Sequence, residues 1–150
     1  MNTEEVARKV VELTRKQSWK EALESLYSKD IVSVEARANE SGSPETRGID
    51  GVRDKVDWWL DSMETHSVKV HGPFVAHDRF VVQYDIDVTD KNSKKRMQIS
   101  EVGVYTVKDG KIVREEFLPL RVTRSERRCV AVAGNSLGPG SPATPIRIPP

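Results

Sequence analysis

The chain has 150 residues, of which 37% are hydrophobic and 31% charged, and its formal net charge is +1. One average-sized domain fits this length, and a second independent core does not. No apolar run approaches the ~20 residues of a membrane span, and no charged start followed by an apolar stretch predicts a signal peptide. The near-zero net charge argues against a protein that coats nucleic acid. A single cysteine, Cys129, excludes a disulfide framework, so a reducing cytoplasm is the expected compartment.

Three helices are predicted in the first half of the chain, each from a polar cap followed by an apolar stripe at helical spacing. The expected caps are Asn2, Ser18 and Asp50. The stripes that follow them are Val6, Val10 and Leu13; Trp19, Leu23, Leu26 and Tyr27; and Val52, Val56, Trp59, Leu60 and Met63. Between the second and third helices, residues 31–36 predict a strand, and the polar residues 39–48 predict a loop.

From Ser67 onward the pattern changes to strands and turns. A first strand over residues 68–76 contains Gly72-Pro73, which predicts a bulge or bend because proline donates no hydrogen bond to a ladder. Three further strands are expected at residues 79–89, 95–107 and 111–118, with a two-residue hairpin turn at Asp109-Gly110. The whole order predicts an α+β fold, with the helices on one face of a mostly antiparallel sheet.

The composition changes after Leu120. Residues 121–150 hold five arginines against one glutamate, a net charge of +4, and five of the eight prolines. We therefore expect a domain over residues 1–120 and a basic, Pro/Gly-rich tail over residues 121–150 that is flexible or laid on the surface. The arginines of this tail are interpreted as a solvated extension or as a patch for an anion or an acidic partner; the composition favours the first.

The hairpin turns predict which side chains share a face of the sheet. Counting back from them, one face is mostly aliphatic but carries five polar side chains: Tyr84, Glu101, Tyr105, Arg114 and Glu116. In this register Tyr84 is expected opposite Glu101, and Tyr105 opposite Arg114. A carboxyl group among aliphatic side chains has a raised pKa and can exchange a proton near neutral pH. Three interpretations stay open: a pocket lining, a structural network, or an outward face of solvated pairs.

The opposite face of the sheet is expected to carry Glu115 and an apolar strip. The strip consists of Val102, Val104, Thr106 and Phe117. Interfaces between identical chains hide strips of this kind, so a homodimer through the outer sheet face is predicted.

The order of elements, the segment Leu26-Tyr27-Ser28-Lys29-Asp30 and the stretch from Glu101 to Phe117 around Asp-Gly-Lys-Ile resemble the nuclear transport factor 2-like superfamily. Its SnoaL-like group is the branch most similar to this chain, over about residues 3–119. The resemblance implies a cystatin-like curved antiparallel sheet with N-terminal helices packed on its concave face. It further implies a cone with a deep apolar pocket and a dimer through the outer sheet face. Function does not follow from the fold, because one scaffold hosts unrelated chemistries.

The resemblance also implies candidate site residues. In the ketosteroid isomerases of this superfamily a carboxylate base on the first strand matches Glu35, and a protonated carboxyl of the oxyanion hole matches Glu101. Their oxyanion-hole tyrosine falls near Val11, which donates no hydrogen bond, and Tyr84 is the candidate replacement. In polyketide cyclases of the SnoaL type a pocket acid often works with a histidine, and His71 takes that role if the Gly72-Pro73 bulge turns it inward.

A third chemistry of the family fits less well. The limonene-epoxide hydrolases use an aspartate–arginine–aspartate group, and the aspartate of their final strand falls at Phe117 here.

The leading hypothesis is an acid–base enzyme, an isomerase, cyclase or dehydratase, that acts on a small apolar or polycyclic substrate. Glu35 or Glu101 exchanges the proton, and Tyr84, Tyr105 and Arg114 orient groups or stabilise an oxyanion. The other residues expected to line the pocket are Glu116, Trp59, Met63, Met97 and His71.

No cofactor is expected, and no metal, because His66, His71 and His77 lack the spacing of a metal site. Neither nucleic acid nor a membrane is an expected partner. The alternative hypothesis is a non-catalytic ligand-binding or dimerisation module of the same fold.

Overall fold

The computed structural model describes residues 1–39 and 41–120. The tail predicted at residues 121–150, with its arginines and Cys129, lies outside the described residues. The helices and strands of the described part are α1 (Thr3–Arg15), α2 (Trp19–Leu26), β1 (Tyr27–Val34), β2 (Glu45–Arg47), α3 (Ile49–Ser62), β3 (Met63–Ala76), β4 (Arg79–Asp90), β5 (Arg96–Lys108) and β6 (Lys111–Pro119). None of these helices is long and apolar enough to cross a membrane.

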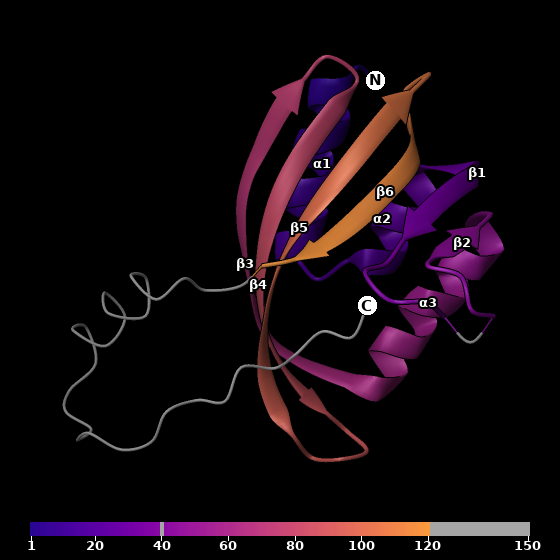
Figure 1. The fold of residues 1–150 in the computed structure, drawn as a ribbon. Coiled ribbons are helices and arrows are strands. Elements are labelled where there is room, and N and C mark those ends of the chain that lie inside the picture. Colours follow the sequence, from indigo (N-terminus) through magenta and orange to yellow (C-terminus); the bar gives the residue numbers. More distant parts are fainter. Residues whose placement is uncertain (40, 121–150) are drawn as a thin grey trace. The chain divides into compact units, whose positions relative to one another are not determined.

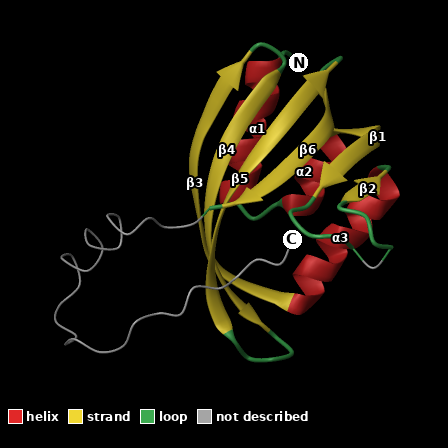
Figure 2. Cartoon of the chain, viewed as in Figure 1, coloured by secondary structure: helices red, strands yellow, loops and turns green. Residues whose placement is uncertain are grey.

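The strands form one curved sheet in the order β2-β1-β6-β5-β4-β3 (Figure 1). Neighbouring strands are antiparallel except β1 and β6, which are parallel. The three helices lie against one face of this sheet (Figure 2). The predicted α+β fold is therefore confirmed. The segment expected to be a loop contains the short strand β2, in which Arg47 pairs with Val32 of β1.

The N-cap residues predicted for α1 and α2 are confirmed, whereas the one predicted for α3 is wrong. Asn2 accepts a hydrogen bond from the Glu5 N–H, and the Asn2 N–H donates to the Glu5 carboxylate, which completes the capping box. Ser18 makes no side-chain cap bond. Helix α3 begins after Gly48, whose φ of 83° favours glycine, so Asp50 lies inside the first turn.

The hydrophobic core lies between the helices and the concave face of the sheet. Helix α1 contributes a wide buried stripe, because residues at spacings of three and four share one side of a helix. Its buried residues are Val6, Ala7, Val10, Val11, Leu13 and Thr14. From the sheet, alternate residues enter the core, among them Ile31, Val70, Phe80, Val82, Tyr84, Ile86, Val88, Tyr105, Val107 and Ile112. The core therefore encloses two tyrosines, which need polar partners.

Strand β6 contains a bulge that the sequence prediction missed. The pair Val107–Ile112 stands as predicted next to the Asp109-Gly110 turn, but the next pair is Thr106–Arg114, so Val113 is the extra residue. A slip of one residue turns every later side chain to the other face of the sheet. The predicted pairing of Tyr105 with Arg114 is therefore wrong.

The slip exchanges the two faces of β6. Glu115 and Phe117 face the core, although both were expected on the outer face. Arg114 and Glu116 face outward, where the Arg114 guanidinium donates to the Glu116 carboxylate at 2.6 Å. Leu118, expected in the core, is 51% exposed.

Gly103 on β5 makes room for the ring of Tyr105 two residues along the same strand. A Cβ at Gly103 would lie 2.7 Å from the Tyr105 ring and 2.8 Å from its hydroxyl oxygen. The ring also stacks on Phe80 at 4.7 Å and meets the edge of Phe117 at 6.3 Å. This enclosure fixes where the Tyr105 hydroxyl lies.

Replacing Gly103 by alanine is expected to destabilise the fold, because the new methyl group overlaps a ring that Phe80 and Phe117 hold in place. Overpacking of this kind costs about 1–3 kcal/mol. Urea unfolding of the G103A variant measures the change. A variant as stable as the natural chain would show that the ring of Tyr105 moves freely, contrary to this packing.

Candidate functional site

The concave face of the sheet brings together polar side chains from four strands and one helix. In the cross-strand register Tyr84 of β4 pairs with Glu101 of β5, as predicted, and Tyr105 of β5 pairs with Glu115 of β6. Ser33 of β1 then pairs with Glu115 from the other side. Paired residues point to the same face of a sheet, so these side chains become neighbours.

Glu115 is the most deeply buried carboxyl group of this cluster, with 3% of its surface exposed. The Tyr27 hydroxyl donates to one of its oxygens at 2.6 Å, and the Ser33 hydroxyl donates to the other at 2.6 Å. Burial raises the pKa of Glu115, and these two hydrogen bonds oppose that rise. Both oxygens of the buried carboxyl are thus satisfied.

Lys55 of α3 is the cation of the cluster. Its ammonium group donates to the Ser33 hydroxyl at 2.7 Å and pairs with the Glu35 carboxylate at 2.5 Å. It also lies 5.8 Å from the centre of the Phe117 ring, within the range of a cation–π contact. Because Lys55 and Glu35 keep 30% and 42% of their side-chain surface exposed, solvent reaches this edge of the cluster.

Glu101 lies largely buried beside these groups, and its proton affinity is strongly altered. Burial, together with the negative charges of Glu35 and Glu115, raises the pKa of Glu101 to about 7, while the positive charge of Lys55 opposes this rise. No hydrogen bond to a described residue contributes to this value. At neutral pH the carboxyl is therefore close to half protonated and has lone pairs and a proton available to a ligand.

Two buried phenols complete the cluster. The hydroxyl groups of Tyr84 and Tyr105 lie 2.7 Å apart and share a hydrogen bond. Burial raises the pKa of both well above the usual value for tyrosine, so both stay protonated at any pH near neutrality. One of the two phenolic protons is used in this bond, and Thr14 is a further hydrogen-bond partner of Tyr84.

The structure places the other expected site residues in different surroundings. Trp59 and Met97 are partly buried and pack against the core, and Met63 is a half-buried residue at the start of β3. Arg114 and Glu116 lie on the outer face because of the β6 bulge. They are not part of the cluster.

His71 also lies on the outer face. The bulge predicted at Gly72-Pro73 is confirmed, since the register of β3 shifts between His71 and Phe74. It does not turn the histidine inward. The His71 ring contacts the Asp85 carboxylate at 3.1 Å instead.

Sequence reasoning missed Tyr27, Ser33, Lys55 and Glu115 as members of the cluster. Glu115 stands between two other charged residues, so only the position of the bulge decides which of them faces inward. Lys55 is one of many charged residues on α3, and nothing in its spacing distinguishes it. Tyr27 was expected only as an apolar residue of the second helix.

Surface cavities lie on the part of the chain described here, and two of them are well defined. One, of about 410 Å³, lies between α1 and β3, and the other, of about 520 Å³, lies around Tyr27, Lys29 and Arg53. Glu35 and Glu101 line neither of them. Within residues 1–39 and 41–120, no group of three histidine, cysteine or acidic side chains is arranged to hold a metal ion.

A family model of the SnoaL-like domain matches residues 1–118. The match spans most of the chain, so this chain belongs to the SnoaL-like domain family. Among curated proteins none matches the chain.

Solved structures agree with the family and the fold. A candidate SnoaL-like polyketide cyclase, also labelled carbohydrate phosphatase, from Mesorhizobium loti is 36% identical; the match covers 79% of this chain and 99% of that one, with a TM-score of 0.73. An NTF2-like protein from Burkholderia thailandensis is 16% identical over 79% and 91% of the two chains, with a TM-score of 0.68. A protein of unknown function with a cystatin-like fold from Xanthomonas campestris is 15% identical over 84% and 96%, with a TM-score of 0.66. The predicted cystatin-like, NTF2-like fold is confirmed.

The raised pKa of Glu101 predicts a pH-dependent stability. The folded protein holds this proton up to about pH 7, whereas the ordinary pKa of a glutamate is 4.5. The contribution to stability is therefore complete below about pH 4.5 and is lost as the pH rises through about 7. Such a displacement corresponds to about 3 kcal/mol.

The difference in unfolding free energy between the natural chain and the E101Q variant is expected to fall by about 3 kcal/mol from about pH 4 to about pH 8. Urea unfolding at several pH values measures it. The matched control is E21Q, at an exposed glutamate of α2, for which the difference stays flat. A flat or rising difference for E101Q contradicts the proposed surroundings of Glu101.

Proposed function

We propose that this SnoaL-like protein is an acid–base enzyme of the isomerase, cyclase or dehydratase type that acts on a small, largely apolar substrate. Glu101 is the group that exchanges the proton. The observation that carries this proposal is a carboxyl group with a pKa of about 7 and no hydrogen-bond partner among the described residues. General acids and bases work best when their pKa lies near the working pH.

The neighbouring groups fit a proton transfer at a carbon atom next to a carbonyl. Ionised Glu101 takes the proton from carbon, and the electron pair of that C–H bond moves to form an enolate. The enolate oxygen needs hydrogen-bond donors, and the phenols of Tyr84 and Tyr105 are neutral donors on the same face. Glu101 then returns the proton to another atom of the substrate, which completes an isomerisation.

Glu35 has a different role in this proposal. The Lys55 ammonium pairs with the Glu35 carboxylate, so the negative charge of Glu35 is balanced by a direct contact. The Ser33 hydroxyl links the same ammonium to buried Glu115. Glu35, Lys55 and Glu115 thus position charge around Glu101 and tune its proton affinity, whereas Glu101 contacts the substrate.

The similarity to the Mesorhizobium loti protein supports the reaction class. At 36% identity over 99% of that chain, the two share a fold and a family. A cyclase of the polyketide type moves protons at carbon atoms beside carbonyl groups, which is the step that the cluster around Glu101 favours. The apolar neighbours of the cluster, Phe117 among them, favour a substrate with little charge.

Exchange of carbon-bound hydrogen tests this proposal without knowledge of the natural substrate. In D2O, the full chain is expected to speed the exchange of α-hydrogens of small cyclic ketones, followed by proton NMR. The E101Q variant should lose about 10²–10⁴-fold of this rate, because glutamine cannot exchange a proton. The rate of the natural chain should rise with pH, with a midpoint near 7.

The control is again E21Q, which changes an exposed carboxyl group of α2 and should exchange at the natural rate. Circular dichroism spectra of both variants establish that each is folded. Exchange by folded E101Q at the natural rate would exclude Glu101 as the acid–base group.

A second proposal concerns assembly: we propose that the chain forms a homodimer through the outer face of the sheet. In the cross-strand register Phe74 pairs with Val81, and Val81 with Val104, which forms an apolar row across three strands. Beside it, Val102 pairs with Leu118. Phe74 is 64% exposed, and no described helix covers this face (Figure 1). A second copy of the same face would remove the row from water.

Sedimentation of the full chain at low micromolar concentration tests the dimer. The V104K variant, in the middle of the row, is expected to shift the species from dimer to monomer, because it buries a charge in the interface. The matched control is W58K, at an exposed tryptophan of α3, which should stay dimeric. A monomeric natural chain contradicts the proposal, and it would leave the proposed chemistry at Glu101 untouched.

A further inference from the structure

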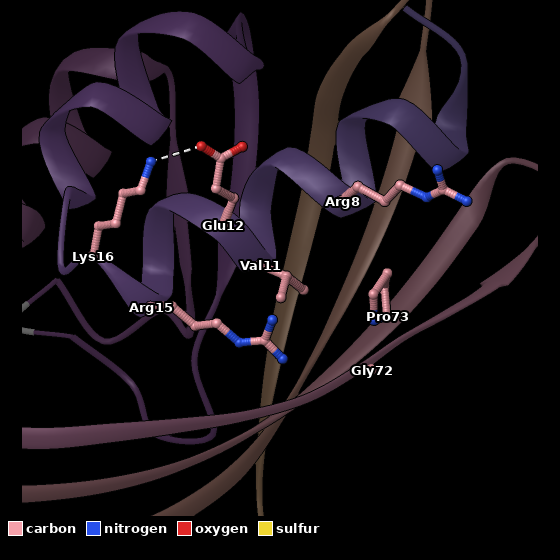
Figure 3. A pocket seen from close by; sticks show the side chains of 7 residues that line it. All are labelled: Arg8, Val11, Glu12, Arg15, Lys16, Gly72 and Pro73. Atoms are coloured by element: carbon pink, nitrogen blue, oxygen red, sulfur yellow. Dashed lines mark hydrogen bonds and ion pairs between the residues drawn. The ribbon is translucent and has the colours of Figure 1, made fainter.

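The cavity of about 410 Å³ between α1 and the edge strand β3 is separate from the cluster around Glu101. One wall is a face of α1, and the other is the Gly72-Pro73 bulge of β3 (Figure 3). Its lining residues are Arg8, Val11, Glu12, Arg15, Lys16, Gly72 and Pro73. Three of the seven are cations, and one is an acid.

The spacing along α1 explains why two guanidinium groups flank this cavity. Arg8, Val11 and Arg15 follow one another at intervals of three and four residues, so they lie on one side of the helix. Seven residues of α-helix rise about 10 Å, so Arg8 and Arg15 stand at the two ends of the cavity. In Figure 3 the side chains of Arg8 and Arg15 extend from α1 on either side of Val11.

The charges of the cavity are unequally paired. Glu12 contacts the ammonium groups of Lys16 at 2.7 Å and Lys9 at 3.5 Å, and both hold the pKa of Glu12 below its usual value. Its negative charge is therefore already balanced. Arg8 pairs with Glu4 one turn earlier on the exposed surface.

Arg15 differs from these residues. Its guanidinium donates to the main-chain oxygen of Val70 at 3.3 Å, and no carboxylate among residues 1–39 and 41–120 lies within ion-pair distance of it. A guanidinium group has five N–H donors, so most of those on Arg15 remain available to a ligand. The cavity thus presents a permanently charged guanidinium group with free N–H donors.

The floor of the cavity is apolar. Val11 is only 4% exposed and forms the bottom between the two arginines, with Pro73 opposite. Inorganic phosphate gains nothing from such a floor. A ligand with a carboxylate at one end and a short hydrocarbon body at the other meets both features, because guanidinium binds carboxylate in a two-pronged manner.

We propose that the cavity between α1 and the Gly72-Pro73 bulge binds a small organic monocarboxylate. Arg15 holds the carboxylate, Arg8 adds a second positive charge, and the hydrocarbon body lies on Val11 and Pro73. The site is independent of Glu101, so it extends the proposed function rather than resting on it.

Titration of the full chain with octanoate, followed by amide NMR, tests this site. We expect a dissociation constant on the order of 1 mM, typical of a small ligand with one charged anchor. Signals of Val11 and Gly72 should move most. The R15Q variant should weaken octanoate binding about tenfold, because it replaces the guanidinium that anchors the carboxylate with a shorter, uncharged polar side chain.

The matched control is K9Q, which removes the same charge from α1 at a lysine that contacts Glu12 and does not line the cavity. Its affinity should stay within about twofold of the natural value. Octanol and inorganic phosphate serve as probes that carry only one half of the ligand, and each should bind at least tenfold more weakly than octanoate.

Equal losses for R15Q and K9Q would overturn the proposal, since they would indicate a general charge effect. Phosphate binding as tight as octanoate binding would overturn the ligand class. Octanoate shifts centred on Tyr84 and Glu101 would move the ligand to the other site and overturn the proposal as well. None of these results bears on hydrogen exchange by Glu101, so the two proposals fail separately.

Discussion

The single extra residue in β6 determines which charge the core of this protein contains. Without the bulge at Val113, Arg114 and Glu116 would face inward, and their opposite charges would enter the core together. With it, the lone carboxyl of Glu115 enters the core and must be satisfied there. Tyr27 and Ser33 donate to its two oxygens, and Lys55 donates to Ser33. A buried carboxyl without such donors would cost several kcal/mol.

This inner network then sets the electrostatics of its neighbour. The Lys55 ammonium directly contacts Glu35 and Ser33, so its positive charge stabilises ionised Glu101 less than it stabilises Glu35. Glu101 is left with burial and two like charges that disfavour its ionised form. The bulge in β6 therefore brings Glu115 into the core, and the hydrogen bonds that satisfy Glu115 leave Glu101 without a comparable partner.

Much of this architecture follows from periodicity, and the failures have a common physical origin. The Tyr84–Glu101 pairing was predictable because a short loop and a regular alternation define the β4–β5 hairpin. The β6 bulge was not, because the alternation of β6 fits either register in a run of charged residues. Glu115 and Phe117 were therefore assigned to the wrong face. Lys55 was missed for another reason: a helix and a strand meet only in the folded chain.

Glu115 and Glu101 distinguish a structural network from a pocket lining, two of the interpretations that the sequence left open. A structural network explains Glu115, whose oxygens both accept hydrogen bonds. It does not explain Glu101, because a network residue would have a partner, and no hydrogen bond to a described residue contributes to its pKa. Typical domains are stable by only about 5–15 kcal/mol. The free-energy cost of keeping the Glu101 carboxyl ionised above neutral pH is therefore a substantial fraction of that stability. Groups kept at such a cost are characteristic of functional sites, where proton affinity rather than stability is what the surroundings determine. For this reason we propose Glu101, and not the better-bonded Glu115, as the acid–base group.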